Sequence, residues 1–117
     1  YHALNLHSVF YRGTVEFRCF NSTLHAGRAV AYVNLCLAMS AQAIAQRSAV
    51  MHKTRSDNEL FTFRTWLVRM GLNGAEFKNT RNHLLANLEG DRAWRYDKDC
   101  YEGNKKKNQE RAGENER

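Results

Sequence analysis

Long apolar runs and proline are both missing from the sequence, which has 117 residues and no proline at all. A helix that crosses a bilayer needs about 20 predominantly apolar residues. The most apolar stretch, residues 29–45, is interrupted by Asn34, Ser40 and Gln42. We therefore expect neither a membrane span nor a membrane partner.

Cysteine is scarce, and no CxxC pair is present. The three widely spaced cysteines are Cys19, Cys36 and Cys100. This spacing matches neither a zinc-ligand pattern nor a disulfide framework. A protein without such a framework is typical of a reducing compartment, so we expect a cytoplasmic location.

Acidic residues are few outside the C-terminal segment. The net charge is +6, and residues 96–117 hold equal numbers of basic and acidic side chains, so the excess lies in residues 1–95. A basic surface favours nucleic acid or phosphate-bearing ligands. Residues 96–117 are polar without apolar periodicity, which predicts a disordered tail behind one folded unit. The carboxylates of that unit are Glu16, Asp57, Glu59, Glu76, Glu89 and Asp91.

Two segments near the N-terminus alternate between apolar and polar residues, which is typical of half-buried strands. They are residues 2–10 and 14–20, joined by a turn at 11–13. Because successive side chains of a strand point to opposite faces, the polar residues of both strands should share one face. The prediction is an antiparallel hairpin, part of a larger sheet. Its polar residues are Asn5, His7, Glu16 and Arg18.

Helical periodicity and helix-ending signals follow the hairpin. Residues 21–23 offer capping side chains for a long apolar helix, which should be largely buried and cover the apolar face of the hairpin. Ser56 to Glu59 matches a capping box, and glycines at 71, 74 and 90 mark a turn and a helix end. The fold class is α+β. The expected helices cover residues 26–47, 58–70 and 75–88.

The pattern Glu16-x-Arg18 places a carboxylate and a guanidinium on one strand face. A carboxylate can bind Mg²⁺, and a guanidinium can bind a phosphate or carboxylate through two parallel hydrogen bonds. Most such pairs on a wet strand face are merely solvated neighbours. Arg12 in the turn is a further candidate for contacting a phosphate.

Several segments, taken in their order along the chain, resemble the C-terminal part of the amidoligase family of ATP-dependent carboxylate–amine ligases, which is related to glutamine synthetase and glutamate–cysteine ligase. The resemblance centres on ALNL (3–6), TVEFR (14–18) and FNSTL (20–24) with the helix after them. Two later segments, FTFRTWLVRMGL (61–72) and HLLANLEGDRAWR (83–95), also resemble members of that family. The resemblance covers residues 1–95 and leaves out the tail.

The resemblance implies a reaction in which ATP and Mg²⁺ activate a substrate carboxylate as an acyl-phosphate, and an amine then displaces the phosphate. On this basis Glu16 would be catalytic as a Mg²⁺ ligand, and Arg18 would be catalytic by contacting phosphate oxygens. Asn5, His7 and Arg12 are candidates for binding substrate or nucleotide. The partners are a carboxylate and an amine substrate and an upstream part of the same catalytic domain. Since further metal ligands and pockets are required, we expect residues 1–117 alone to be inactive.

Two alternatives remain open. Residues 58–88 could form a helix-turn-helix that binds nucleic acid, with Lys78, Arg81 and Asn82 on its second helix. An ordinary helical hairpin is the simpler interpretation of that segment, so nucleic acid is not the expected partner. The second alternative is a scaffold that derives from a ligase but has lost its activity.

Overall fold

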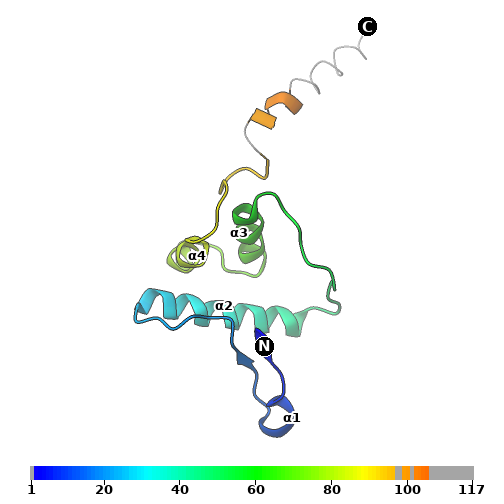
Figure 1. The fold of residues 1–117 in the computed structure, drawn as a ribbon, viewed down its shortest axis with the longest axis vertical. Helices are drawn as coiled ribbons and strands as arrows, with labels where there is room; N and C mark the ends of the chain where they lie inside the picture. Colours follow the sequence, from blue (N-terminus) through cyan, green and yellow to red (C-terminus); the bar gives the residue numbers. More distant parts are fainter. Residues whose placement is uncertain (1, 97–98, 101, 106–117) are drawn as a thin grey trace.

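The structure is a computed structural model that describes residues 2–96, 99–100 and 102–105. It is mostly helical, with one small two-stranded sheet. Figure 1 shows the hairpin with α1 on one side of the long helix α2, and α3 and α4 on the other. The elements in chain order are β1 (Leu4–Asn5), α1 (Val9–Arg12), β2 (Glu16–Phe17), α2 (Ala26–Ala45), α3 (Glu59–Arg69) and α4 (Lys78–Leu85).

The predicted hairpin is present, but its strands are shorter than expected. β1 and β2 pair antiparallel, with Leu4 opposite Phe17 and Asn5 opposite Glu16. The prediction of a strand through residue 10 is wrong, because the chain turns into the short helix α1. Strict alternation already stops at Val9 and Phe10, which are adjacent apolar residues. Gly13 ends α1 in the left-handed conformation (φ 67°), which glycine adopts without a steric cost.

The hydrophobic core lies between α2, α3 and α4. Leu35 of α2, Leu67 of α3 and Leu85 of α4 are buried together with Leu72 of the connecting turn. Inside this helical region the Asn34 side chain donates a 2.9 Å hydrogen bond to the hydroxyl of Thr80, a buried residue of α4. The α3–turn–α4 segment therefore packs on α2.

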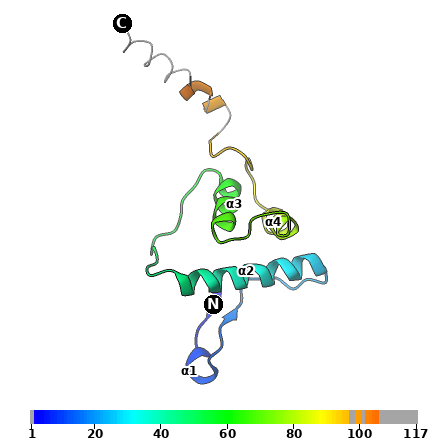
Figure 2. The same ribbon diagram turned by 180° about the vertical axis from the view of Figure 1, so that it is seen from behind.

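The expected burial of the long helix is wrong. Only Ala31 and Leu35 of α2 are buried, whereas Val33 is 57% and Leu37 64% exposed. The helix packs on α4 through one stripe, because its neighbours α3 and α4 lie on one side of it (Figure 2). The other side of α2 stays largely open.

The prediction that this helix covers the apolar face of the hairpin is also wrong. Leu4 is 40% and Val15 50% exposed, as expected for side chains without a covering layer. A contact forms where the chain leaves β2: the rings of Phe20 and Tyr32 stack with centroids 4.5 Å apart. The hairpin is attached to α2 at its base and projects away from it (Figure 1).

By length and composition alone, α2 is also apolar enough to cross a membrane. This test is weak evidence, because core helices of soluble proteins pass it too. The stripe of α2 that meets α4 carries Asn34, whose amide binds Thr80. A bilayer around α2 would also enclose the polar helix α4, with Lys78 and Arg81. Packing on α4 accounts for one side of α2 and leaves apolar residues on its other side exposed.

Two helix caps differ from the sequence prediction. The N-cap of α2 is His25, whose Nδ1 accepts a hydrogen bond from the Arg28 amide, and Asn21 lies outside the cap. The N-cap of α3 is Asn58, whose side chain accepts from the Phe61 amide at 2.9 Å. Ser56 instead bonds to both backbone groups of Asn58, so the capping box does not form.

The last helix is shorter than the predicted range of 75–88, because its first and last predicted residues form turns. Gly71 and Gly74 have positive φ in the connecting turn, as the sequence indicated. In the segment predicted to be a disordered tail, the backbone of residues 99–100 and 102–105 is helical. Residues 97–98, 101 and 106–117 of that segment lie outside the described residues.

Candidate functional site

The polar face of the hairpin brings together three of the predicted site residues. Antiparallel pairing sets Asn5 opposite Glu16, and Arg18 follows two residues later on the same face. Asn5 Nδ2 and Arg18 Nη2 each donate a hydrogen bond of 2.9 Å to Glu16. Both bonds end on Oε2, so Oε1 of the carboxylate accepts neither of them.

The Glu16 carboxylate is accessible and is held in its charged form. The hydrogen bond from Arg18, followed by that from Asn5, lowers the pKa of Glu16. The Glu16 side chain is 52% exposed and that of Arg18 38%. Water screens exposed ion pairs, so this pair adds little to stability. The arrangement presents a carboxylate and a guanidinium side by side at the surface.

His7 and Arg12 lie outside this three-residue cluster. The His7 backbone amide donates to Asn5 Oδ1 at 3.0 Å, while its ring tilts against that of Tyr11 with centroids 5.1 Å apart. Arg12 is an exposed residue in the last turn of α1. Within residues 2–96, no hydrogen bond or ion pair connects its side chain to Glu16 or Arg18.

A shallow hollow of about 380 Å³ lies beside the cluster. It brings together three of the predicted site residues, Asn5, His7 and Arg18, next to the apolar side chains of Leu4 and Leu6. The hollow is thus a surface lined by an amide, an imidazole and a guanidinium. Its lining is His2, Leu4, Asn5, Leu6, His7 and Arg18.

The hairpin alone does not provide a complete metal site. No group of three or more His, Cys, Asp or Glu side chains with metal-binding geometry occurs among the described residues. Magnesium prefers oxygen ligands, and protein sites commonly supply one or two carboxylates while water and phosphates supply the rest. Glu16 fits as one such ligand, and any further protein ligand would come from elsewhere.

The structure brings two histidines together that the sequence did not connect. The rings of His25 and His83 lie with centroids 5.0 Å apart at the start of α2. A Cβ added to Gly27 would lie 2.6 Å from His83 Nε2, so the absence of a side chain at residue 27 leaves room for this ring. No sequence pattern links two residues this far apart. His25 caps α2, so this member of the pair has a structural role.

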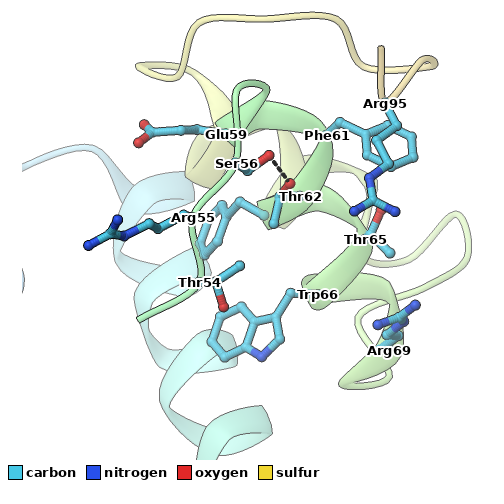
Figure 3. A pocket seen from close by; sticks show the side chains of 11 residues that line it. Thr54, Arg55, Ser56, Glu59, Phe61, Thr62, Thr65, Trp66, Arg69 and Arg95 are labelled. Atoms are coloured by element: carbon cyan, nitrogen blue, oxygen red, sulfur yellow. Dashed lines mark hydrogen bonds between the residues drawn. The ribbon is translucent and has the colours of Figure 1, made fainter. Parts of the chain in front are cut away.

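A second pocket, of about 500 Å³, was also not foreseen. It lies between α3, the segment 54–56 and Arg95, and Figure 3 shows its aromatic, hydroxyl and arginine side chains. The signal in the sequence was weak, because the lining comes from three separate segments. The lining residues are Thr54, Arg55, Ser56, Glu59, Phe61, Thr62, Phe63, Thr65, Trp66, Arg69 and Arg95.

The helix-turn-helix alternative loses one of its candidate base-reading residues. Arg81 donates hydrogen bonds to the carbonyls of Leu72 and Gly74, at 2.8 and 2.9 Å. Its guanidinium therefore holds the turn between α3 and α4. Lys78 and Asn82 of α4 are exposed.

Comparison with protein families gives one match. Residues 1–40 match the model of the family described as "Putative amidoligase enzyme", Amidoligase_2. The match spans β1, α1, β2 and most of α2, and so includes Asn5, Glu16 and Arg18. Neither the curated proteins nor the solved structures gave a match.

Proposed function

We propose that this chain supplies the metal- and phosphate-binding hairpin of an ATP- and Mg²⁺-dependent carboxylate–amine ligase. The observation that carries the proposal is the convergence of Asn5 Nδ2 and Arg18 Nη2 on one oxygen of Glu16. This cluster lies within the residues that match the amidoligase family model. A charged carboxylate beside a guanidinium suits a site that handles a metal ion and phosphate groups together.

Each residue of the cluster has a distinct role in this proposal. Glu16 binds Mg²⁺, and Oε1, which accepts neither of the two hydrogen bonds, is the oxygen that we assign to this role. Asn5 fixes the carboxylate rotamer from the opposite strand. Arg18 holds Glu16 ionised and turns toward phosphate oxygens when substrate binds, which stabilises charge that develops there.

The proposed reaction forms an amide bond in two steps. A substrate carboxylate oxygen attacks the γ-phosphorus of ATP, which gives an acyl-phosphate and ADP. An amine then attacks the acyl carbon and releases inorganic phosphate and a proton. When Mg²⁺ is bound, it neutralises charge on the phosphates. The side chains of Asn5, His7 and Arg18 around the hollow orient the substrate carboxylate, and Arg12 remains a candidate for contacting the nucleotide.

The proposal requires the rest of a catalytic domain, because a single carboxylate cannot form the whole site. The exposed apolar face of the hairpin, with Leu4 and Val15, and the open side of α2, with Val33 and Leu37, offer the surface for it. Burial of apolar surface is favourable at roughly 25 cal/mol per Å². We therefore propose that the upstream part of the same domain extends the hairpin into a larger sheet.

The test is Mg²⁺-dependent release of ADP from ATP, measured on the chain together with its upstream domain and with pooled amino acids and amines. We expect turnover in the wild type, and a loss of about 100-fold or more in Glu16→Gln, which keeps the shape and hydrogen-bonding capacity of the side chain but removes its charge. Glu76→Gln is the matched control, since Glu76 is exposed and lies far from the hairpin in sequence.

Three outcomes separate the alternatives. Equal turnover in the wild type and Glu16→Gln would remove Glu16 from the mechanism. Absence of turnover with every substrate pool, in a folded protein, would favour an inactive scaffold. Salt-sensitive binding of duplex DNA that Lys78→Gln abolishes would favour the nucleic-acid alternative.

A further inference from the structure

The second pocket, between α3, residues 54–56 and Arg95, has the size of a small-molecule site. Its volume of about 500 Å³ lies in the range of about 300–1,000 Å³ typical of ligand pockets. The hairpin lies on the opposite side of α2 from α3 in both ribbon views (Figures 1 and 2). The pocket is therefore separate from the cluster around Glu16.

One wall of the pocket is cationic. Thr65 and Arg69 are one helical turn apart on α3, so their side chains lie on the same face. Figure 3 shows Arg95 on that side of α3 as well. Within the described part of the chain, neither the Arg69 nor the Arg95 guanidinium donates a hydrogen bond or forms an ion pair. Arg95 lies 5.5 Å from the centre of the Tyr96 ring, a cation–π contact that leaves its N–H donors unused.

The position of Arg95 is fixed by hydrogen bonds in the segment before it. Asn58 Nδ2 donates to the carbonyls of Asp91 and Trp94, at 3.1 and 2.8 Å. The Asp91 carboxylate accepts from the amides of Ala93 and Trp94. The N-cap of α3 and this segment thus hold each other in place. Such prior ordering lowers the entropic cost of binding a ligand.

A second wall of the pocket is aromatic. Phe63 and Trp66 stack with ring centroids 5.6 Å apart, and Phe61 lies beside Arg95 in Figure 3. Aromatic faces accept flat rings in an offset-stacked arrangement. Thr54 also lines the pocket and adds a hydroxyl group to it.

The charge of the lining selects for anions. The charged residues of the lining are Arg55, Arg69, Arg95 and Glu59, which carry three positive charges and one negative charge. Guanidinium groups bind phosphate through paired hydrogen bonds, and a threonine hydroxyl donates one more. A pocket with a cationic part and an aromatic part of its lining fits a ligand that combines a phosphate with a flat ring.

We propose that this pocket binds a mononucleotide, with its phosphate between Arg69, Thr65 and Arg95 and its base on the aromatic wall. The site is distinct from the ATP-using site of the proposed function. An acidic protein segment is the main competitor. We favour the nucleotide because the pocket has the volume of one small molecule and because an acidic peptide would leave the aromatic wall unused.

The experiment titrates the 117-residue chain with adenosine 5′-monophosphate in EDTA, with calorimetry for affinity. For location it uses tryptophan fluorescence of a Trp94→Phe variant, in which Trp66 is the one tryptophan of the sequence. EDTA suppresses binding that depends on Mg²⁺, as expected at Glu16. We expect adenosine and inorganic phosphate each to bind at least about tenfold more weakly than the nucleotide, because each engages one wall only. Arg69→Gln should weaken nucleotide binding by about tenfold or more, since it removes charge-assisted hydrogen bonds.

Three variants make the test specific. Arg47→Gln removes the same charge at an exposed residue outside the pocket and should leave affinity unchanged. Arg69→Lys keeps the charge but not the planar fork, and should lie between the wild type and Arg69→Gln. Glu16→Gln should bind the nucleotide like the wild type, whatever its effect on ligase activity.

The inference is overturned by any of four results. These are an absence of nucleotide binding, equal weakening in Arg47→Gln and Arg69→Gln, loss of binding in Glu16→Gln, and tighter binding of a poly-glutamate peptide than of the nucleotide. Failure here leaves the ligase proposal untouched, because that proposal depends on Glu16 and on turnover. Circular dichroism of each variant confirms that the helices are intact.

Discussion

The side-chain amide of Asn34 in α2 donates a 2.9 Å hydrogen bond to the hydroxyl of Thr80 in α4, and this contact spans 46 positions of the chain. Thr80 is buried, so its hydroxyl depends on a protein partner. The hydrogen bond sets the position of α4 along α2 in a way that apolar packing alone does not.

This contact predicts a measurable coupling between the two residues. Thr80→Val should lower the free energy of unfolding by about 1 kcal/mol, because the Asn34 amide loses its partner at nearly constant side-chain shape. Asn34→Ala and the double variant complete a double-mutant cycle, measured by urea unfolding, with an expected coupling of about 1 kcal/mol. Alanine also has a higher helix propensity than asparagine, and the cycle subtracts this effect because it occurs with and without Thr80. Additive effects would show that the bond contributes nothing.

The ionisation of Glu16 should depend on its two partners. Because Arg18 and then Asn5 lower its pKa, the NMR titration of the Glu16 carboxyl carbon should have its midpoint below the ordinary glutamate value. Arg18→Gln should raise the midpoint more than Asn5→Ala does. A midpoint unchanged by Arg18→Gln would contradict the hydrogen-bonded geometry.

The lowered pKa of Glu16 also predicts the effect of acid on the hairpin. A carboxyl group with a lowered folded pKa stabilises the fold fully above its unfolded pKa, and this contribution is lost as the pH falls through the folded pKa. The contacts between β1 and β2 should therefore weaken only in acid, over the range where Glu16 protonates. Cross-strand NMR contacts between Asn5 and Glu16, followed as the pH falls, would show this, with Glu16→Gln as the pH-insensitive control.

Replacement of Gly90 should weaken the start of α3. Gly90 has φ +127°, and a Cβ there would collide with the side chain of Asn58, the N-cap of α3. Gly90→Ala should lower the free energy of unfolding by about 2–3 kcal/mol, since backbone strain adds to loss of the cap. Chemical denaturation followed by circular dichroism measures this.

Gly13→Ala is the matched control for backbone strain without a collision. Gly13 also has positive φ, but an added Cβ there would meet no atom within 4 Å. Its replacement should cost about 1 kcal/mol, the penalty of a left-handed alanine alone. Equal losses at the two glycines would mean that the contact with Asn58 is unimportant.

The thiols should differ in reactivity. Burial, and then the neighbouring Cys19, raise the pKa of Cys36, whereas Cys19 itself is exposed. Since the thiolate is the nucleophile, Cys36 should react with a disulfide reagent more slowly than Cys19 at pH 8. Rates in a Cys100→Ser background, with Cys19→Ser and Cys36→Ser as single-site references, test this. Faster reaction at Cys36 would overturn the prediction.

The sequence predicted the local features of the fold well. Alternation placed Asn5, Glu16 and Arg18 on one face, because side chains in a strand must point to opposite sides in turn, and the structure joins the three by hydrogen bonds. The turn at Gly71 and Gly74 and the existence of all three main helices followed from periodicity and from glycine's freedom at positive φ.

Features that depend on distant segments were missed. The Asn58 cap is reinforced by bonds to Asp91 and Trp94, which no local pattern contains. Arg81 was a candidate for reading nucleic acid, but its bonds to Leu72 and Gly74 give it a structural role. The second pocket likewise draws its lining from three separate segments.

The sequence by itself determined that Asn5, Glu16 and Arg18 share a face and roughly where the three main helices lie, since those properties depend on backbone geometry and neighbouring side chains. Only the tertiary structure decided which side of α2 is buried. Apolar residues occur almost all round that helix, so its pattern carries no preferred direction. Packing on α4 decided which side is buried, because Leu35 and Asn34 of α2 have their partners there. The opposite side of α2 remains open.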